Sequence, residues 1–281
     1  MPEIMINRFH EVSNVCSKIC TEKYSTSFSS AIKLLHKDLH TPIYNIYGFV
    51  RFADEIVDSF HDFNKPILLQ EFYEQTMQAI ERKISTNPIL NSFQFTVNKY
   101  GISFELIESF FNSMESDLCN TSYNADGIKD YIFGSAEVVG LMCLSVFCEG
   151  DTKNYEILKP YAKSLGAAFQ KVNFLRDIKE DKQILNRDYF PGVNAVNFGS
   201  YKIKIEADIA RDFQQAFTGI KMLPEKARLG VYVAYKYYQN LFKKIQKAKP
   251  SFILNSRIRV PNYSKLYILF TAGLRSQLRL F

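Results

Sequence analysis

The sequence predicts an all-α protein, built as a single helical domain over residues 1–281. Apolar residues recur at spacings of three and four along most of the chain, which is the pattern of amphipathic helices. Gly and Pro number only 12 and 9, which is low for a turn-rich β fold. No run alternates apolar and polar residues as a half-buried strand does. We therefore expect about eight to ten helices around an apolar interior.

The helical segments follow one another with short breaks. The spacing predicts helices over residues 8–36, 41–62, 66–84, 90–98, 103–118, 126–149, 152–181, 201–222, 224–248 and 261–278. Pro, Gly and polar pairs separate them, at Thr41-Pro42, Lys65-Pro66, Asn87-Pro88, Tyr100-Gly101, Gly150-Asp151, Pro191-Gly192, Leu223-Pro224 and Lys249-Pro250. Thr41-Pro42 and Asp151-Thr152 are typical helix starts. Residues 182–200 form the longest irregular segment, and long ordered loops often carry function.

Composition narrows the class of protein. The hydrophobic share of 47% is ample for a core, and the net charge of +6 comes from Lys and Arg spread along the chain rather than from a nucleic-acid-binding arm. A weakly basic surface suits anionic substrates or lipid headgroups. The apolar run at 138–148 is too short to span a bilayer. We expect a cytoplasmic protein without nucleic-acid partners; peripheral contact with the inner face of the plasma membrane, and the oligomeric state, stay open.

Residues 51–60, RFADEIVDSF, place a polar stripe on an apolar helix. Its members fall at positions i, i+3, i+4 and i+7 of one face: Arg51, Asp54, Glu55 and Asp58. The remaining positions from Ile46 to Val57 are apolar residues or glycine. Because surface helices usually show the reverse proportion, this helix is predicted to be largely buried, with its acidic stripe facing an internal space.

The same design recurs at residues 170–181, QKVNFLRDIKED. A second stripe falls at i, i+3, i+7 and i+11: Gln170, Asn173, Asp177 and Asp181. Phe174 and Ile178 flank this stripe. The stripe begins with the carboxamides Gln170 and Asn173 and ends with a second pair of aspartates in DxxxD spacing.

Each stripe has a simpler interpretation. The first is also explained by a local Arg51–Asp54 ion pair, and the second by a solvated surface balanced by Lys179 and Lys182. Two such stripes favour a binding site. Buried carboxylates stay charged only when they have partners, and a bound cation would supply one. Oxygen ligands without His or Cys favour Mg²⁺, or Mn²⁺. Since Mg²⁺ takes further ligands from phosphates, the pattern predicts a metal-bridged diphosphate between two helices, beside an apolar cavity for a long hydrocarbon.

These motifs resemble those of the squalene/phytoene synthase family. The resemblance runs through YSTSFSSAIKLL (24–35), IYNIYGFVRFADEIVD (43–58), YIFGSAEVVGLM (131–142), QKVNFLRDIKED (170–181), NRDYFP (186–191) and VPNYSK (260–265). It implies a single-domain helical bundle of the isoprenoid synthase type with a central apolar cavity. The combination in this order is specific, although each piece alone is not.

The resemblance also implies roles for individual residues. Metal ligands would be Asp54, Asp58, Asn173, Asp177 and Asp181. Diphosphate contacts would come from Ser25, Ser27, Arg51, Gln170, Arg176, Arg187 and Tyr189. Catalytic positions near the reacting carbons would be Tyr131 and Tyr238, together with Arg51. For Arg176, an i,i+4 bridge to Glu180 is an equally weighted alternative.

The chain departs from the family pattern at three positions. Glu55 stands where many relatives have a second adjacent aspartate, Phe133 where a second tyrosine is common, and Glu137 where a small residue is usual. Glu55 keeps the charge, whereas Phe133 removes a hydroxyl group from the cavity.

The resemblance implies an Mg²⁺-dependent prenyltransferase, a 15-cis-phytoene synthase that condenses two geranylgeranyl diphosphates head to head in carotenoid biosynthesis. No NADPH is expected for this reaction. Squalene formation needs that cofactor, and the sequence has no Gly-rich dinucleotide loop. The alternative is a dehydrosqualene or squalene synthase acting on two farnesyl diphosphates. A second alternative, a non-catalytic assembly subunit of the same fold, fits less well because all four aspartates are present.

Overall fold

The structure is a computed structural model that describes residues 2–119, 122–185, 187–190, 193, 197–259, 268–269 and 271–272. In order, its helices are α1 (Pro2–Tyr24), α2 (Thr26–Ile32), α3 (Lys37–Ser59), α4 (Lys65–Arg82), α5 (Pro88–Tyr100), α6 (Phe104–Cys119), α7 (Ala125–Ile132), η1 (Phe133–Glu137), α8 (Val138–Cys148), α9 (Thr152–Gln183), α10 (Phe198–Met222), α11 (Glu225–Lys247) and α12 (Pro250–Asn255). Among these residues the β-type pairing is one isolated bridge, between Ser122 and Asp188. The all-α prediction is confirmed.

Two helix boundaries differ from the prediction at the N-terminal end. The expected helix over 8–36 breaks at Ser25, which adopts an extended conformation and caps α2 by accepting a hydrogen bond from the Phe28 backbone N–H. The predicted start at Thr41-Pro42 is wrong, because α3 begins at Lys37 and carries Pro42 inside it. A proline this close to a helix start removes only one early backbone hydrogen bond. The start at Asp151 is confirmed, with its side chain accepting from the Asn154 N–H.

The predicted helix over 126–149 contains a π-helical turn. Between α7 and α8, the Val138 N–H bonds to the carbonyl of Phe133, an i→i+5 step. Such turns occur often at functional sites. This one begins two residues after Tyr131 and includes Glu137, whose side chain pairs with Lys163 at 3.2 Å.

The C-terminal end differs as well. The short helix α12 is absent from the prediction. The predicted helix over 261–278 falls almost entirely outside the described residues, as does the VPNYSK segment.

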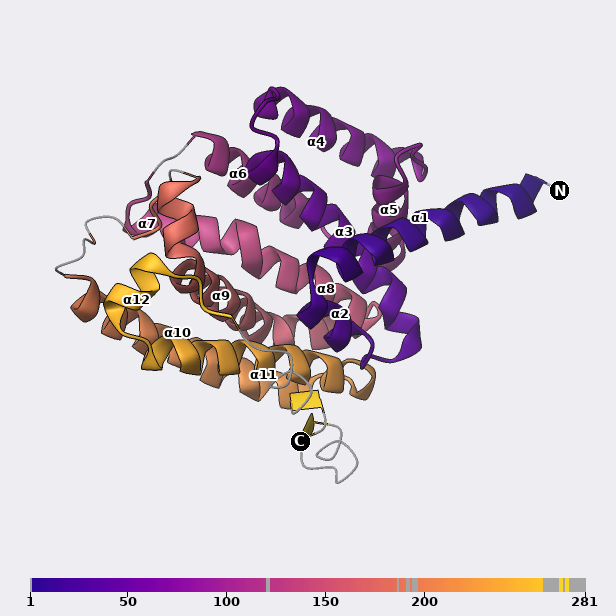
Figure 1. The fold of residues 1–281 in the computed structure, drawn as a ribbon. Helices are drawn as coiled ribbons and strands as arrows, with labels where there is room; N and C mark the ends of the chain where they lie inside the picture. Colours follow the sequence, from indigo (N-terminus) through magenta and orange to yellow (C-terminus); the bar gives the residue numbers. More distant parts are fainter. Residues whose placement is uncertain are drawn as a thin grey trace.

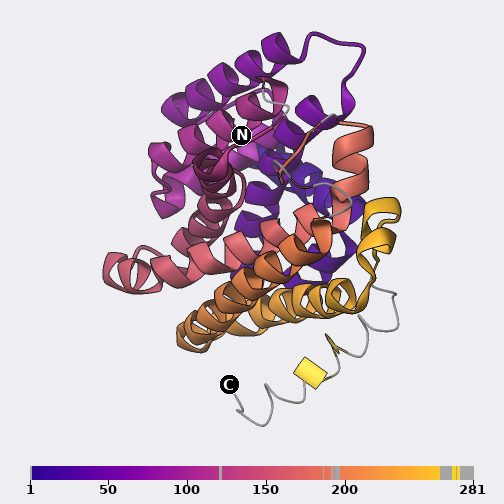
Figure 2. The ribbon, with the colours of Figure 1, turned by 90° about the vertical axis from the view of Figure 1, so that its left-hand side faces the viewer.

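The bundle has α8 and α9 in its middle, with α10 and α11 along one side and α4 to α6 on the other (Figures 1 and 2). The N-terminal end of α1 projects from this body (Figure 1). Buried apolar side chains from Ala31 to Ala272 form one continuous cluster. Phe49 of α3 stacks on Phe93 of α5 at 3.8 Å and meets Phe110 of α6 at 5.3 Å. This packing fixes α3, and so the first polar stripe, within the bundle.

One helical run in the described part of the chain, Asp126–Cys148, has the length and hydropathy of a membrane span. Half of its most apolar window is buried inside the bundle, and a core helix passes the same test. The apolar run at residues 138–148 is only the C-terminal part of this longer helical run, so its length alone did not indicate a membrane span.

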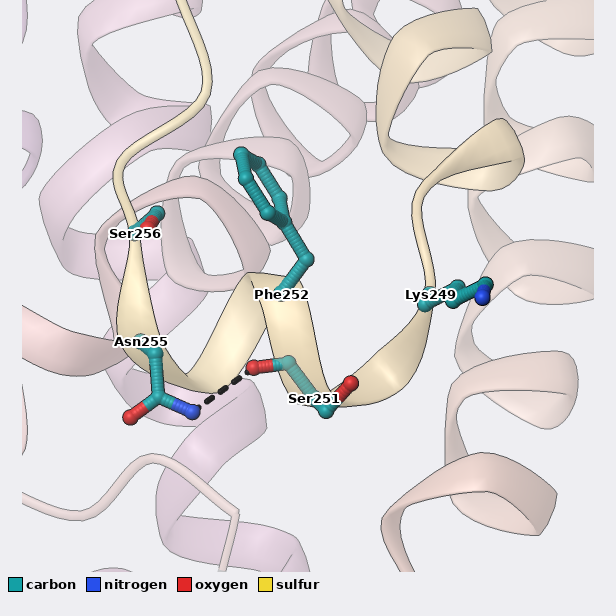
Figure 3. A pocket seen from close by; sticks show the side chains of 5 residues that line it. All are labelled: Lys249, Ser251, Phe252, Asn255 and Ser256. Atoms are coloured by element: carbon teal, nitrogen blue, oxygen red, sulfur yellow. Dashed lines mark hydrogen bonds between the residues drawn. The ribbon is translucent and has the colours of Figure 1, made fainter.

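Two surface depressions lie away from the polar stripes. One is lined by residues of α12 and its flanks, Lys249, Ser251, Phe252, Asn255 and Ser256 (Figure 3). The other is a groove of about 360 Å³ between α4 and α6, where Tyr73 and Phe111 contribute to the lining. Neither includes a predicted site residue.

Candidate active site

The first polar stripe lies on the C-terminal half of α3. Arg51 forms a close ion pair with Glu55, and its guanidinium lies over the Tyr24 ring at 4.4 Å. Asp54 is 4.0 Å from Arg51 and keeps 33% of its side chain exposed, while that of Asp58 is 35% exposed. The two aspartates are therefore partly accessible although the helix around them is packed in the core.

Arginines hold the second stripe, on α9. The Nε of Arg176 donates to Asp177 at 2.8 Å. Arg257, in the segment after α12, lies 2.9 Å from Asp177 and 2.7 Å from Glu180. The alternative Arg176–Glu180 bridge is wrong, because Arg257 takes the Glu180 carboxylate. Sequence analysis missed Arg257, since only the fold brings residue 257 beside residue 177.

The simpler interpretations of the stripes hold only in part. The Arg51–Asp54 pair is present at 4.0 Å, but Glu55 is the closer partner of Arg51. On the second stripe, Lys182 pairs with Asp188 at 3.1 Å and leaves Asp177 to the arginines.

Arg187 brings the two stripes together. Its guanidinium lies 2.8 Å from Asp58 and donates to the carbonyl of Val57, both on α3. Its backbone N–H donates to the carbonyl of Asp181 on α9 at 2.8 Å. The same side chain lies 3.5 Å from Asp117 of α6. One almost fully buried arginine from the irregular segment thus joins both aspartate motifs.

The carboxylates of the two motifs influence one another's pKa values. Burial raises the pKa of Asp54 to about 7, and the charge of Asp58 adds to the shift. Burial raises the pKa of Asp181 to about 8, with further contributions from Asp177 and from Asp58 across the site. At both aspartates, burial and the neighbouring carboxylates outweigh the lowering effect of the arginines.

A polar atom without a partner lies beside the second motif. The side-chain oxygen of Asn173 is buried and accepts no hydrogen bond. Burial raises the pKa of Tyr238, whereas the charge of Arg176 and a hydrogen bond with Asn173 lower it. Tyr238 therefore reaches the second motif from α11. An orphaned buried oxygen at this point is a suitable ligand for a cation.

Partly exposed aromatic rings lie next to this motif. Phe169, beside the partly buried Gln170, stacks on Tyr238 at 3.8 Å. Phe28 of α2 lies 5.9 Å from Tyr238 and 6.0 Å from Tyr47 of α3. Because these rings come from α2, α3, α9 and α11 and remain partly exposed, they are suited to contact an apolar ligand.

The N-terminal serines are placed less directly. The hydroxyl group of Ser25 caps α2. Burial raises the pKa of Tyr47, and a hydrogen bond with Ser25 partly offsets this by lowering it. Ser27 is partly buried in the first turn of α2. The structure thus gives Ser25 a capping contact, and the diphosphate contacts of Ser25 and Ser27 stay predictions.

A buried carboxylate missed by sequence analysis lies at the end of α6. Asp117 accepts hydrogen bonds from the hydroxyl groups of Tyr131 at 2.8 Å and Tyr189 at 3.1 Å. Phe110, Met114 and Asp117 share one buried helix face at i, i+4 and i+7. An aspartate on an apolar stripe was therefore the available signal, and it is the same signal that singled out the two motifs.

The described residues contain no group of three His, Cys, Asp or Glu side chains arranged as a ready metal cage. The donors that could hold a hard cation are carboxylate and amide oxygens on facing helices: Asp54, Asp58, Asn173, Asp177 and Asp181. Such a donor set fits a cation that takes its other ligands from a bound phosphate.

Comparison with known proteins identifies the family. The squalene/phytoene synthase profile matches residues 21–199, well over half of the chain. The 4,4'-diapophytoene synthase of Staphylococcus haemolyticus (strain JCSC1435) is 24% identical over 277 residues, covering 89% of this chain and 92% of that protein. The chloroplastic phytoene synthase 1 of Zea mays is 24% identical over 259 residues, covering 85% of this chain and 63% of that protein.

Solved structures agree on the fold. A ligand-bound dehydrosqualene synthase aligns with a TM-score of 0.81 at 20% identity, covering 97% of this chain and 98% of the other. A squalene synthase from Alicyclobacillus acidocaldarius aligns with a TM-score of 0.74 at 17% identity, covering 85% and 94%. With the matched motifs on facing helices and the profile spanning both, this chain belongs to the squalene/phytoene synthase family.

Proposed function

We propose that the protein condenses two geranylgeranyl diphosphates head to head into phytoene and releases diphosphate. The observation that carries this proposal is Arg187, which joins the two aspartate motifs across α3 and α9. Acidic motifs that meet from opposite helices, with arginines between them, suit a diphosphate held by cations and guanidinium groups.

The residues present fit Mg²⁺. The orphaned oxygen of Asn173 and the raised pKa values of Asp54, about 7, and Asp181, about 8, all indicate unsatisfied demand for positive charge. The cation would be held by Asp54, Asp58, Asn173, Asp177 and Asp181. When bound, it would neutralise charge developing on the departing diphosphate.

The protein's own groups would do the remaining work. Arg176 and Arg187 would exchange their aspartate partners for diphosphate oxygens, since Arg binds both groups in the same bidentate manner. Loss of diphosphate from the first substrate leaves an allylic cation, and the double bond of the second attacks it. The tertiary cation formed in this way loses a proton as the cyclopropane ring closes, which gives a cyclopropylcarbinyl diphosphate. This intermediate loses the second diphosphate, rearranges and gives up a second proton to form the central double bond. The aromatic rings of Phe28, Phe169 and Tyr238 would exclude water from these cations.

A second candidate uses two farnesyl diphosphates and yields dehydrosqualene. The 4,4'-diapophytoene synthase relative, 92% of which is covered, favours this candidate. The maize phytoene synthase, equally identical, favours the C20 substrate. The choice depends on the length of the predicted central cavity. We further expect action in the cytoplasm, on substrates supplied as diphosphates.

Product analysis tests the proposal. Purified protein is incubated with Mg²⁺ and either the C15 or the C20 diphosphate, with and without NADPH, and the hydrocarbons are extracted and identified. Phytoene from the C20 substrate, independent of NADPH, is the expected result. A product from the C15 substrate alone would replace phytoene by dehydrosqualene, or by squalene if NADPH is required. No hydrocarbon from either substrate would favour a non-catalytic subunit.

A further inference from the structure

Asp117 is the meeting point of three tyrosine hydroxyl groups. Tyr131 donates to its Oδ2 at 2.8 Å, while Tyr189 and Tyr123 donate to its Oδ1 at 3.1 and 3.4 Å. Only 3% of its side chain is exposed. Carboxylates are almost never this buried unless they are paired. Here the hydrogen bonds come from Tyr131 on α7, from Tyr123 just before α7 and from Tyr189 in the segment after α9.

The charged partner of Asp117 is Arg187. The guanidinium donates to the Asp117 carbonyl at 3.3 Å and lies 3.5 Å from its carboxylate. Its other end lies 2.8 Å from Asp58 of the first motif. Tyr131, Asp117, Arg187 and Asp58 thus form an unbroken chain of polar contacts from α7 to α3.

The rings of the same tyrosines form a compact cluster on α9. Tyr131 lies 5.1 Å from both Tyr123 and Tyr189, and Tyr189 stacks on Phe174 at 4.3 Å. Phe174 is adjacent to Asn173, whose oxygen lacks a partner. The cluster therefore packs against the second motif while its hydroxyl groups converge on Asp117.

The contacts specify the orientation of two groups. The single proton of the Tyr131 hydroxyl group is used toward Asp117, with the Tyr189 hydroxyl 3.2 Å away. Arg187 is buried and held at both ends. Buried polar networks of this kind are weak contributors to stability, because apolar side chains of equal volume often serve as well or better. They do fix the geometry of the groups they connect.

We propose that Asp117 is a positioning residue of the condensation reaction: it orients the hydroxyl group of Tyr131 and the guanidinium group of Arg187, so that one buried carboxylate couples the reacting centre to the diphosphate-binding motifs. This inference rests on the proposed function. In this proposal Asp117 acts through these two partners, whose contacts with it are direct.

The test compares Asp117→Asn with a matched control, Asp212→Asn. Both replacements remove a largely buried carboxylate, but Asp212 pairs with Lys171 at 2.7 Å and contacts none of the tyrosines. With the substrate that the wild type uses, Asp117→Asn should lower kcat by at least about 10-fold and change KM by less than about 3-fold. The control should stay within about 2-fold of the wild type.

A mutant cycle separates positioning from general damage. If Asp117 acts only through Tyr131 and Arg187, adding Asp117→Asn to a variant that carries both Tyr131→Phe and Arg187→Lys should cost less than about 3-fold further, whereas independent effects would multiply. Multiplying effects, or an Asp117→Asn variant with wild-type kcat, would overturn the proposal. A loss of kcat shared equally by Asp212→Asn would also overturn it.

Folding is monitored by far-UV circular dichroism. Should Asp117→Asn lose its helical signal, Asp117→Glu replaces it, because this variant keeps the buried charge and moves the carboxylate by one methylene. A folded Asp117→Glu variant with wild-type kcat would overturn the positioning role. A wild-type protein that yields no hydrocarbon would instead overturn the proposed function, and the positioning role with it.

Discussion

At the scale of single residues, the ion pairs of the motif aspartates bear most directly on the proposed function. Asp58 pairs with Arg187, and Asp177 pairs with Arg176 and Arg257, so each motif has cationic partners of its own. The same guanidinium groups suit diphosphate oxygens. Diphosphate binding as proposed would replace these ion pairs by contacts between the arginines and the diphosphate.

We predict that Asp54→Asn and Asp177→Asn each lower turnover by at least about 100-fold, the scale of removing a charge-stabilising group from an active site. The amide keeps the shape of the side chain and removes the charge that a cation needs. Hydrocarbon yield is the measurement, and Asp126→Asn, which alters only an exposed pair with Lys129, is the control. Wild-type turnover in both active-site variants would refute the site assignment.

A second prediction concerns pH. The folded-state pKa values of Asp54, about 7, and Asp181, about 8, lie above the ordinary carboxyl value, so the native protein holds protons that the unfolded chain releases. The stability this provides is fully present below about pH 4 and is lost as pH rises through about 7 and 8. The melting temperature of the metal-free protein, measured in chelator, should therefore fall as the pH rises from about 4 to about 8 and level off above that range.

The matched variants sharpen that measurement. Asp54→Asn and Asp181→Asn should flatten the fall, because an amide does not titrate, while Asp126→Asn should keep the wild-type slope. A slope that is the same in all four proteins would show that other groups govern the pH dependence.

At the scale of elements, the position of α9 decides the geometry of the second motif. A Cβ atom added at Gly166 would lie 2.7 Å from the carbonyl oxygen of Ala136 and 2.9 Å from the Cα of Glu137. The backbone of α9 therefore approaches η1 more closely than any side chain permits. This approach fixes the position of α9 in the bundle, and with it the positions of Asn173 and Asp177 farther along the same helix.

We predict that Gly166→Ala destabilises the protein by about 1–3 kcal/mol, the usual cost of overpacking, because backbone atoms of η1 cannot move aside. Turnover should fall with it as α9 shifts. The control is Gly199→Ala in the first turn of α10, where an added Cβ meets only Pro250 at 3.8 Å. Denaturant unfolding measures the free energy of unfolding of both variants. If Gly199→Ala lowered it as much as Gly166→Ala or more, the close approach of α9 to η1 would not explain the effect.

At the scale of the whole molecule, the site is shared between α3, α6, α7, α9 and the segment around Arg187. Cations and diphosphate held between α3 and α9 should therefore stabilise the fold jointly. Mg²⁺ together with pyrophosphate is expected to raise the melting temperature by roughly 5 °C at saturating concentrations, more than the sum of the two added separately. Asp177→Asn should abolish the joint effect, whereas purely additive shifts that persist in this variant would argue against a shared site.

The sequence by itself determined the elements and much of the site. Local periodicity marks a helix wherever only one of its faces is buried. Most of the helices, and the two aspartate motifs on them, could therefore be predicted. Periodicity failed at Ser25 and Lys37, where capping and a hydrogen bond from His36 to Lys226 outweigh the local pattern. The ion pair between Arg176 and Asp177 is also local, because the two residues are neighbours on α9.

Only the tertiary structure decided which groups meet. Arg187 joins Asp58, Asp117 and Asp181, which are far apart in the chain, and Arg257 closes on Asp177 in the same way. The role of Asp117 was hidden because its three tyrosine partners come from three separate segments. Periodicity reports which face of a helix is buried, whereas the identity of the buried partner depends on packing between helices, which no local pattern encodes.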